Sequence, residues 1–403
     1  MLITIAWRNI WRSRTRSLVV MAAIVIGIWA LAFMISFSLG MARSYVSSAI
    51  ENSLSHLQAH HPQFGADAEA RYYLDVPIEL QEEVRKLPEV QNTTARTLLT
   101  GMLTTGKSPR GIQIRGIDPA GEAAVTRLNE KIVAGAYLSD DNRRQILIGE
   151  RLAQKMGAKI RSKVVLTFQD VHGNITAGAF RVGGLFNTGN RPFDEGTVFV
   201  DRRELNELFG PADAAHEMAI YLRDPETLAD AQRRVQQELA DAKVENYREL
   251  SPDVLLYESQ IQTSATIFIV IIMLALLFGI INTMLMAVLE RYHELGMLMA
   301  IGMNKGRVFA MIVLETLLLS GAGSLPGLLL GWLTVTRLQH TGIDLSSFSQ
   351  SMEQFGLSQM VYPSLNADMY LQLAAAVVVT ALAGAIYPAW KAIRLRPVEA
   401  IGH

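Results

Sequence analysis

The run Gly-Met-Leu-Thr-Thr-Gly-Lys-Ser at residues 101–108 has the most specific chemical pattern in the sequence. It matches G-x-x-x-x-G-K-[ST], a loop that binds phosphate when a helix begins directly after it and points its N-terminal amides at the anion. Here Pro109 and a strand-like run follow instead. The sequence therefore favours a hairpin with a glycine turn, and we expect no ATP site on this chain.

Histidines are the other residues whose spacing could do chemistry. His56, His60 and His61 lie close together, and the first two are one turn apart if this segment is helical. The sequence has no cysteine and no evident third ligand, so a polar surface is favoured over a metal site. Two His-Glu pairs, at residues 216–217 and 293–294, lack the second histidine of a zinc-protease motif. The sequence predicts neither a metal site nor catalytic residues.

The charged residues that surround these motifs are distributed unevenly along the chain of 403 residues. The net charge is −1, and half of the residues are hydrophobic. Residues 43–258 hold 57 charged side chains among 216 positions, as in a soluble domain, whereas the other 187 positions hold only 18. We therefore expect a soluble domain inserted into a membrane protein. The near-zero total predicts no nucleic-acid partner.

Four apolar runs are long enough to cross a bilayer, which takes about 20 residues. Only the third run contains a charged residue, Glu315. The first run is longer than the core of a signal peptide, which favours an uncleaved helix. The sequence thus predicts an α-helical membrane protein with four transmembrane helices and a large α+β extracytoplasmic domain between helices one and two. The predicted segments are an amphipathic helix (1–16), transmembrane helix 1 (17–42), the α+β domain (43–260), helix 2 (261–289), a loop (290–307), helix 3 (308–336), an outer loop (337–369), helix 4 (370–390) and a tail (391–403).

Basic residues that flank the apolar runs predict the orientation. The segments before the first helix, between the second and third, and after the fourth hold ten Lys and Arg residues against three Glu. The connection between the third and fourth helices holds one Arg against three acidic residues. We therefore expect both termini and the 290–307 loop in the cytoplasm of a bacterium, and the 43–260 domain outside the inner membrane.

The predicted outer domain contains short runs in which hydrophobic and polar residues alternate, as in half-buried strands. The expected strands cover residues 111–116, 145–149, 164–168, 179–182 and 197–200. Helices are expected near residues 76–87, 150–156, 202–209 and 227–240, and residues 44–57 are expected to extend the first transmembrane helix. The domain is therefore predicted to be mixed α+β.

The first 16 residues form an amphipathic pattern. Trp7 and Trp11 share one helical face with isoleucines, and Arg8 and Arg12 lie on another face. Tryptophan at the interface and arginine near anionic headgroups are typical of a helix on the inner leaflet of the membrane. The alternative is a charged flank that only sets the topology.

The third apolar run contains small residues at every fourth position: Gly323, Gly327 and Gly331. This spacing lets another helix approach closely, either within one subunit or between two. Glu315 lies about two turns inside the same run. A carboxylate there either faces protein or water and has a function, or lies near enough to the headgroups to be solvated.

The 290–302 segment is short, polar and then apolar, and it joins two membrane helices directly. A compact amphipathic helix here could bind a cytoplasmic partner and transmit a push into both helices. A structured linker is the alternative.

Several motifs in these segments resemble those of one known family. They are Gly279 to Arg291, Glu294-Leu-Gly296, Ala300-Ile-Gly302, Glu315 before the glycines, and Tyr387-Pro-Ala-Trp-Lys391 near the end. Together they resemble the permease family that contains macrolide exporters, lipoprotein-releasing permeases and the cell-division permease, the type VII or mechanotransmission ABC systems. The resemblance covers the whole chain, including the order of one span, a large outer domain and three further spans.

The resemblance implies a partner and a mechanism. It implies two permease subunits, identical or homologous, with a cytoplasmic dimer of ABC ATPase subunits that holds the ATP and magnesium, while this chain binds no cofactor. ATP-driven closure would reshape the outer domain without passing substrate through a central channel. The family's coupling helix corresponds here to 290–302, with the coupling residues Glu290, Arg291, Glu294, Leu295, Gly296, Ala300 and Gly302.

The motifs at residues 115–119, 146–153, 182–189 and 362–365 are similar to the lipoprotein-releasing branch of this family. They imply release of lipoproteins or lipidated cargo to a periplasmic lipoprotein carrier. The chain departs from macrolide exporters in lacking a fused ATPase, whereas the surroundings of Asn282 look exporter-like. Export of a small molecule or peptide with an adaptor is one alternative. Regulation of a cell-wall hydrolase is another, but the 216-residue outer insertion disfavours it.

Overall fold

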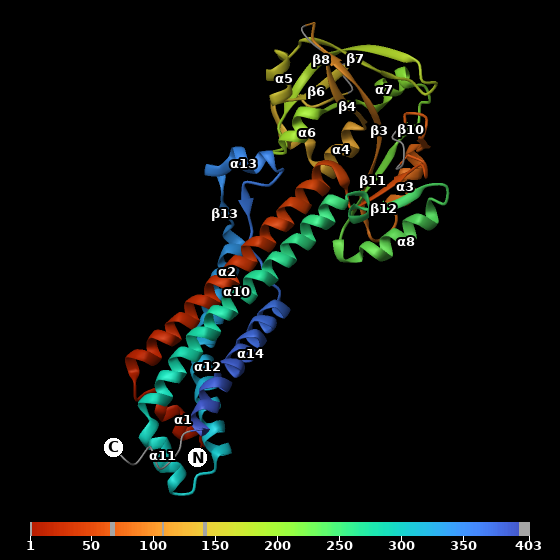
Figure 1. Ribbon diagram of the computed structural model, residues 1–403. Helices are drawn as coiled ribbons and strands as arrows, with labels where there is room; N and C mark the ends of the chain where they lie inside the picture. The colour runs from red at the N-terminus through yellow and green to blue at the C-terminus, as the bar shows by residue number, and fades with distance from the viewer. Residues whose placement is uncertain (1, 65–68, 107–108, 140–142, 395–403) are drawn as a thin grey trace. The chain divides into compact units, whose positions relative to one another are not determined.

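The computed structural model describes residues 2–64, 69–106, 109–139 and 143–394 (Figure 1). The chain forms two compact units. We call the first the helical unit; it comprises Met1–Ala42, Glu258–Asp344 and Met360–His403. The second, the α+β unit, comprises Arg43–Tyr257 and Leu345–Gln359.

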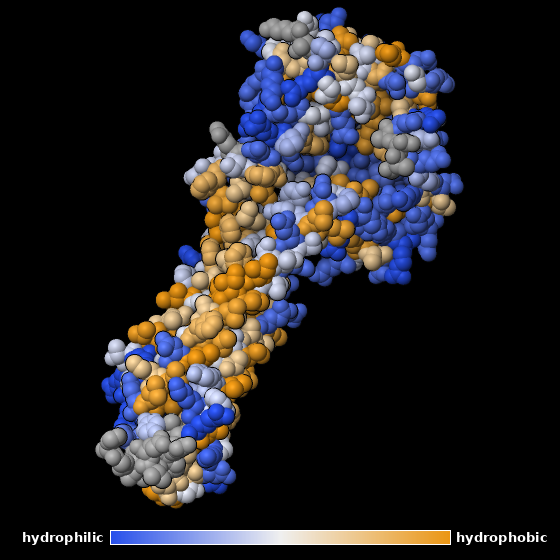
Figure 2. Space-filling view, viewed as in Figure 1, coloured by the Kyte–Doolittle hydropathy of each residue, from blue (hydrophilic) through white to orange (hydrophobic). Residues whose placement is uncertain are grey.

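Four helices are long and apolar enough to cross a membrane, which confirms the four predicted apolar helices. Figure 2 shows orange, hydrophobic surface along these helices, and large side chains such as Phe268 and Phe278 of α10 are exposed there. Exposed apolar surface of this extent is typical of a lipid-facing bundle. The helices are α2 (Arg14–Ala49), α10 (Pro252–Glu290), α12 (Lys305–Thr341) and α14 (Ala367–Ile393). The unit also holds α1 (Leu2–Ile10), α11 (Tyr292–Ala300), and the paired strands β13 (Ile343–Asp344) and β14 (Met360–Val361).

The predicted glycine row of α12 packs against α2 of the same chain. A Cβ atom added at Gly323 would lie 3.0 Å from Ile24 Cβ, and one at Gly327 would lie 3.0 Å from the Val25 carbonyl oxygen. One at Gly331 would lie 2.9 Å from the Ala32 Cβ. The absence of side chains at these three positions therefore brings the two helix backbones together within one subunit.

The α+β unit is built on a ten-stranded sheet in which six strands form a ring. The pairings run from β3 to β4, β9, β6, β8 and β7 and return from β7 to β3. All six strands contribute to one apolar core, with Leu103, Ile114 and Phe180 among its fully buried members. The ring strands are β3 (Val90–Thr104), β4 (Pro109–Ile117), β6 (Gln145–Gly149), β7 (Lys163–Gln169), β8 (Ile175–Phe186) and β9 (Thr197–Asp201).

Four further strands extend the sheet beyond the ring, and two short strands form a separate two-stranded sheet. On the far side of β3 the sheet continues with β11 (Glu217–Leu222), β1 (Leu57–His60) and β12 (Lys243–Asn246), and a second apolar core that includes Val84 and Val235 packs there. Strand β5 (Ile132–Gly135) pairs with β8. Strand β10 (Ala214–Ala215) pairs with β2 (Leu74–Asp75). The helices are α3 (Ile78–Arg85), α4 (Pro119–Thr126), α5 (Glu150–Met156), α6 (Arg191–Gly196), α7 (Arg202–Phe209), α8 (Leu228–Glu238), α9 (Tyr247–Leu250) and α13 (Ser349–Gln354). Short turns of helix are η1 (Ile50–Leu54, a π-helix), η2 (Leu128–Lys131), η3 (Pro225–Thr227) and η4 (Ser346–Phe348).

The five predicted strands and four predicted helices of the outer domain are confirmed, with shifted ends. The predicted helical extension over 44–57 is wrong at its end. The helix stops at Leu54, Ser55 has a φ of +51°, and β1 begins at Leu57. The chain reverses here because a positive φ cannot continue a right-handed helix.

A buried ion cluster lies between the two cores of the α+β unit. Arg96 on β3 donates to both carboxylate oxygens of Glu122 at 2.8 Å and to Glu217 on β11 at 2.5 Å. These side chains are 1%, 2% and 4% exposed. Burial of these charges is tolerated because each carboxylate has a cation at hydrogen-bond distance.

The first prediction concerns the glycine row. Replacing Gly327 with Leu forces a side chain against the backbone of α2, and overpacking of this kind costs about 1–3 kcal/mol. We expect a lower midpoint of thermal unfolding for purified Gly327→Leu in detergent. The matched control is Gly321→Leu in the same helix, where an added Cβ meets nothing within 4 Å. Equal midpoints for the two variants would contradict the packing role.

Candidate functional site

The segment between α10 and α12 contains a short helix, α11, which spans Tyr292–Ala300. The predicted compact helix in this segment is therefore confirmed. Leu295 and Gly296 are its buried residues, and Leu295 packs with Met284 of α10 and Met311 of α12. One face of α11 is thus anchored to the two long helices that it connects.

The end of α11 depends on the backbone of Gly302. This residue has a φ of +105°, which L-residues rarely adopt, and its amide donates to the Met299 carbonyl at 3.1 Å. Ala300 and Gly302 are both exposed. Met297 and Ile301, four residues apart, are 52% and 80% exposed. Because residues at this spacing share a face, the anchored helix presents an apolar surface on its other side.

Two arginines near the start of α2 bind the α11 region. Arg12 donates to Glu294 through Nη1 at 2.7 Å, and its Nη2 lies 2.5 Å from the other carboxylate oxygen. Arg16 Nη1 lies 2.6 Å from Glu290 Oε2 at the end of α10. The hydrogen bond from Arg12 is the largest influence on Glu294 and lowers the pKa of its carboxyl group. The two-point contact between the Arg12 guanidinium and the Glu294 carboxylate fixes the relative orientation of the two groups as well as their distance.

Arg291 continues these contacts into α12. Its Nε lies 3.4 Å from Glu294, and its Nη1 lies 3.4 Å from Glu315. The Glu315 side chain is only 9% exposed. We name Arg12, Glu294, Arg291 and Glu315 the charge chain, because cation and anion alternate along it. The carboxylate inside the third long helix is thus paired with a cation.

The N-terminal residues form a helix and a turn, where the sequence predicts one helix over 1–16. Helix α1 ends at Ile10, α2 begins at Arg14, and Trp11 and Arg12 lie in the turn between them. Ile10 is buried against the long helices, so it does not share the environment of the two tryptophans. Trp7 and Trp11 are 44% and 41% exposed and meet edge to face, with ring centroids 6.0 Å apart.

The structure brings together residues that the sequence assigned to separate roles. Arg12, assigned to the membrane interface, contacts the coupling residue Glu294, and Glu315 contacts the coupling residue Arg291. The exposed Arg8 lies on α1, and the glycine row packs on α2. Sequence reasoning missed the pairing of Arg16 with Glu290. The only signal was the complementary charge of the two segments, which does not specify which side chains meet.

The other chemical motifs have structural explanations where they are described. Lys107 and Ser108 lie outside the described residues, but β3 and β4 pair antiparallel up to Thr104 and Pro109 on either side. The predicted hairpin is therefore confirmed. His60 lies in strand β1, so the helical spacing assumed for it is wrong. Across the described ranges, no group of three or more His, Cys, Asp or Glu side chains is placed to hold a metal ion.

The second prediction concerns the ion pair inside the helical unit. Replacing Arg291 with Met leaves the buried Glu315 carboxylate without its cation, which in general costs about 3–5 kcal/mol. We expect a clear drop in the midpoint of thermal unfolding in detergent. Arg291→Met combined with Glu315→Gln removes both charges and should recover most of the loss. Arg8→Met, at an exposed arginine of α1, is the control; no recovery in the double variant would refute the pairing.

Two family descriptions match this chain. Residues 17–238 match the MacB-like periplasmic core domain, and residues 266–397 match the C-terminal region of FtsX-like permeases.

Curated relatives are permeases. The chain is 22% identical to the lipoprotein-releasing system transmembrane protein LolC of Xylella fastidiosa, over 74% of this chain and 75% of that protein. It is 24% identical to an uncharacterized ABC transporter permease of Methanocaldococcus jannaschii, over 99% and 97%. It is 23% identical to the pyoverdine export ATP-binding/permease protein PvdT of Pseudomonas putida, over 98% of this chain and 58% of that protein.

The comparison with solved structures matches isolated domains over about half of this chain. The periplasmic region of MacB from Actinobacillus actinomycetemcomitans is 13% identical, with 49% of this chain and 91% of that one covered and a TM-score of 0.36. The extracellular domain of YknZ from Gram-positive bacteria is 15% identical, with 47% and 99% covered and a TM-score of 0.35. With more than half of its length matched by the MacB-like core and its last third by the FtsX-like region, the chain belongs to the MacB- and FtsX-like family of ABC transporter permeases, the type VII group.

Proposed function

We propose that this chain is a permease subunit that couples ATP hydrolysis by a separate cytoplasmic ATPase to movement of an extracytoplasmic domain. In this proposal the chain has no ATPase site of its own, and ATP and magnesium are held by the partner dimer. The observation that carries the proposal is α11, which is anchored on one face and bound by the charge chain, while Met297 and Ile301 are exposed on the other.

The proposed topology follows from the charges of the sequence. The helical unit crosses the bacterial inner membrane with both termini and α11 in the cytoplasm, and the α+β domain lies outside, between the first and second spans. A second permease subunit, identical or homologous, completes the assembly. The exposed Trp7 and Arg8 of α1 are placed to contact the headgroups of the inner leaflet.

The proposed cargo is a lipoprotein or another lipidated molecule released from the inner membrane to a periplasmic carrier. Its support is the similarity to a lipoprotein-releasing permease together with the motifs of that branch in the α+β domain. Export of a small molecule with an adaptor is the second candidate. It is supported by similarity to a pyoverdine export protein over 98% of this chain.

The third prediction tests the proposed docking surface. Glutamate at Met297 or Ile301 places a charge on an apolar contact without disturbing the fold, because both side chains are exposed. We expect each variant to weaken association with the ATPase about tenfold, which corresponds to ~1.4 kcal/mol. The measurement is co-purification and cargo-stimulated ATP hydrolysis in proteoliposomes. Met297→Leu keeps the apolar surface and is the control. Unaltered association of both glutamate variants with the ATPase would contradict the docking role.

The fourth prediction tests the charge chain by reversal. Arg12→Glu or Glu294→Arg places like charges together and should reduce the fraction of ATP hydrolysis that is coupled to cargo release. The double variant restores opposite charges at the same positions and should recover most of that fraction. Arg8→Glu is the control for altered membrane binding, since Arg8 is exposed on α1. Failure of the double variant to recover, with normal assembly, would show that this pair does not position α11.

A further inference from the structure

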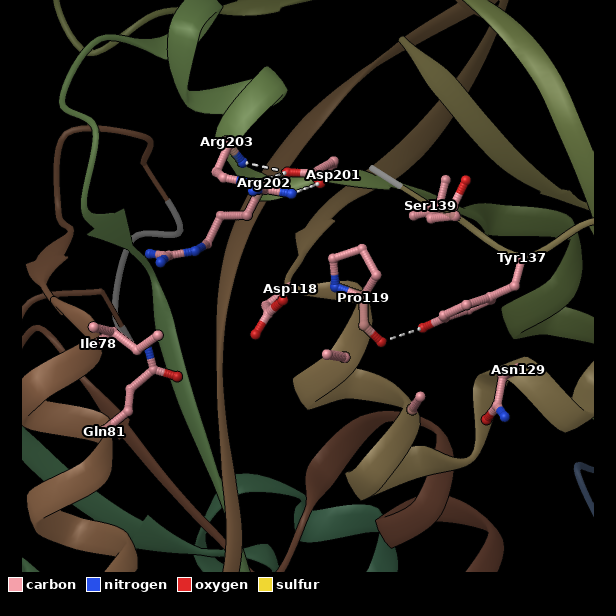
Figure 3. A pocket seen from close by; sticks show the side chains of 13 residues that line it. Ile78, Gln81, Asp118, Pro119, Asn129, Tyr137, Ser139, Asp201, Arg202 and Arg203 are labelled. Atoms are coloured by element: carbon pink, nitrogen blue, oxygen red, sulfur yellow. Dashed lines mark hydrogen bonds and ion pairs between the residues drawn. The ribbon is translucent and has the colours of Figure 1, made fainter. Parts of the chain in front are cut away.

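The α+β unit contains a pocket that the permease function does not use. Its volume is about 560 Å³, within the usual range for small-molecule sites. The start of α3, the start of α4, the segment around Tyr137 and the start of α7 form its walls (Figure 3). These segments are distant in the sequence and meet only through the fold of this unit.

Gln81 provides the first sign that the pocket is built for a ligand. The residue is 94% buried, since only 6% of its surface is exposed, and it lines the pocket. Its backbone carbonyl accepts a bond from Thr93, but within the described residues its side-chain amide has no hydrogen-bond partner. The amide is therefore open to the pocket, where it can donate to and accept from an occupant.

Asp118 and Arg202 provide the second sign. Asp118 is the N-cap residue of α4, yet its side chain makes no cap hydrogen bond. Arg202 bonds only to the Asp213 carbonyl, at 3.4 Å, and no carboxylate lies within ion-pair distance among the described residues. Its neighbour Arg203 is paired with Asp201 at 2.8 Å. Figure 3 shows the Asp118, Arg202 and Gln81 side chains around one space.

Burial affects the Arg202 guanidinium more than any nearby charge does. Burial is the largest influence and lowers the pKa of Arg202, whereas the negative charges of Asp213 and Asp118 raise this pKa. A half-buried cation without a direct counterion binds anionic groups favourably, because such a group replaces the lost hydration.

The rest of the lining is mixed. Apolar residues lie beside Asn129, Ser139 and the paired Asp201 and Arg203. Ile78 is 62% exposed although it is a large hydrophobic residue, and the buried Leu138 also lines the pocket. Tyr137 is fixed by a hydrogen bond from its hydroxyl to the Pro119 carbonyl at 3.0 Å. The pocket therefore combines apolar side chains with the Gln81 amide and with a carboxylate and a guanidinium that have no ion-pair partner among the described residues.

We propose that this pocket binds a small zwitterion with an apolar body, with its ammonium group at Asp118 and its anionic group at Arg202. Gln81 donates to and accepts from the polar groups between them. A short apolar peptide carries this chemistry in full, and the headgroup of an aminophospholipid carries its two charged groups. The proposal is independent of the cargo proposed above, because it concerns binding to the α+β unit alone.

The experiment is calorimetric titration of the purified full chain with three related dipeptides. Leucyl-leucine carries both charges, N-acetyl-leucyl-leucine lacks the ammonium, and leucyl-leucinamide lacks the carboxylate. Each lost charge-assisted hydrogen bond should weaken binding about tenfold. Glycerophosphoethanolamine is titrated in parallel: binding of this compound identifies a headgroup source, and binding of the dipeptide alone identifies a peptide source.

Matched variants assign each charge to its partner. Asp118→Asn should abolish the difference between leucyl-leucine and its acetylated form, and Arg202→Gln should abolish the difference between leucyl-leucine and its amide. Both side chains are partly exposed and are not part of the apolar core, so the unfolding midpoint should be unchanged. Arg233→Gln, on the exposed surface of α8, is the control.

Three results would overturn the proposal. One is the absence of binding by either zwitterion at millimolar concentration. Another is equal binding of the charged and blocked dipeptides. The third is equal binding of leucyl-leucine by the wild-type protein and both pocket variants.

Discussion

Arg291 is the residue on which the arrangement of α10, α11 and α12 depends. It lies between the last residue of α10 and the first residue of α11, and its guanidinium contacts carboxylates on α11 and α12. Glu315 is nearly buried in an apolar helix, where an unpaired carboxylate is costly. Because the Arg291 guanidinium contacts both Glu294 and Glu315, the position of α11 depends on the same cation that compensates the carboxylate of α12.

The molecule uses ion pairs in two different environments. Arg96 and its two glutamates are almost completely buried, so their geometry must be kept for the charges to remain compensated. Arg12 and Glu294 are 62% and 36% exposed, so water and salt can replace either partner. The first kind stabilises one arrangement of the sheet. The second kind can break and form again, as a helix that transmits ATP-driven motion would require.

The sequence predicts the features that repeat along the chain. Apolar length predicts the four long helices, alternation predicts five of the six ring strands, and the four-residue glycine spacing predicts a close helix contact. The sequence does not predict the first half of β3, because Thr93, Thr94 and Arg96 are polar and do not form an alternating pattern. These residues are nevertheless buried, in a strand that pairs with β11. Nor does the sequence predict Arg12 beside Glu294, since the two are 282 residues apart and only the fold joins them.

Helix α2 and the π-helical turn η1 that follows it are held by polar contacts near both ends. Near the start, Arg16 binds Glu290 within the helical unit. In η1, within the α+β unit, the Asn52 side chain accepts from Lys131 at 2.8 Å and the Ile50 carbonyl accepts from Tyr221 at 2.6 Å.

Backbone carbonyls at a helix end carry partial negative charge, so the Tyr221 hydroxyl is a suitable donor to Ile50. Under the proposed function, a displacement of α11 acts on the start of α2, within the helical unit, through Arg12 and Arg16.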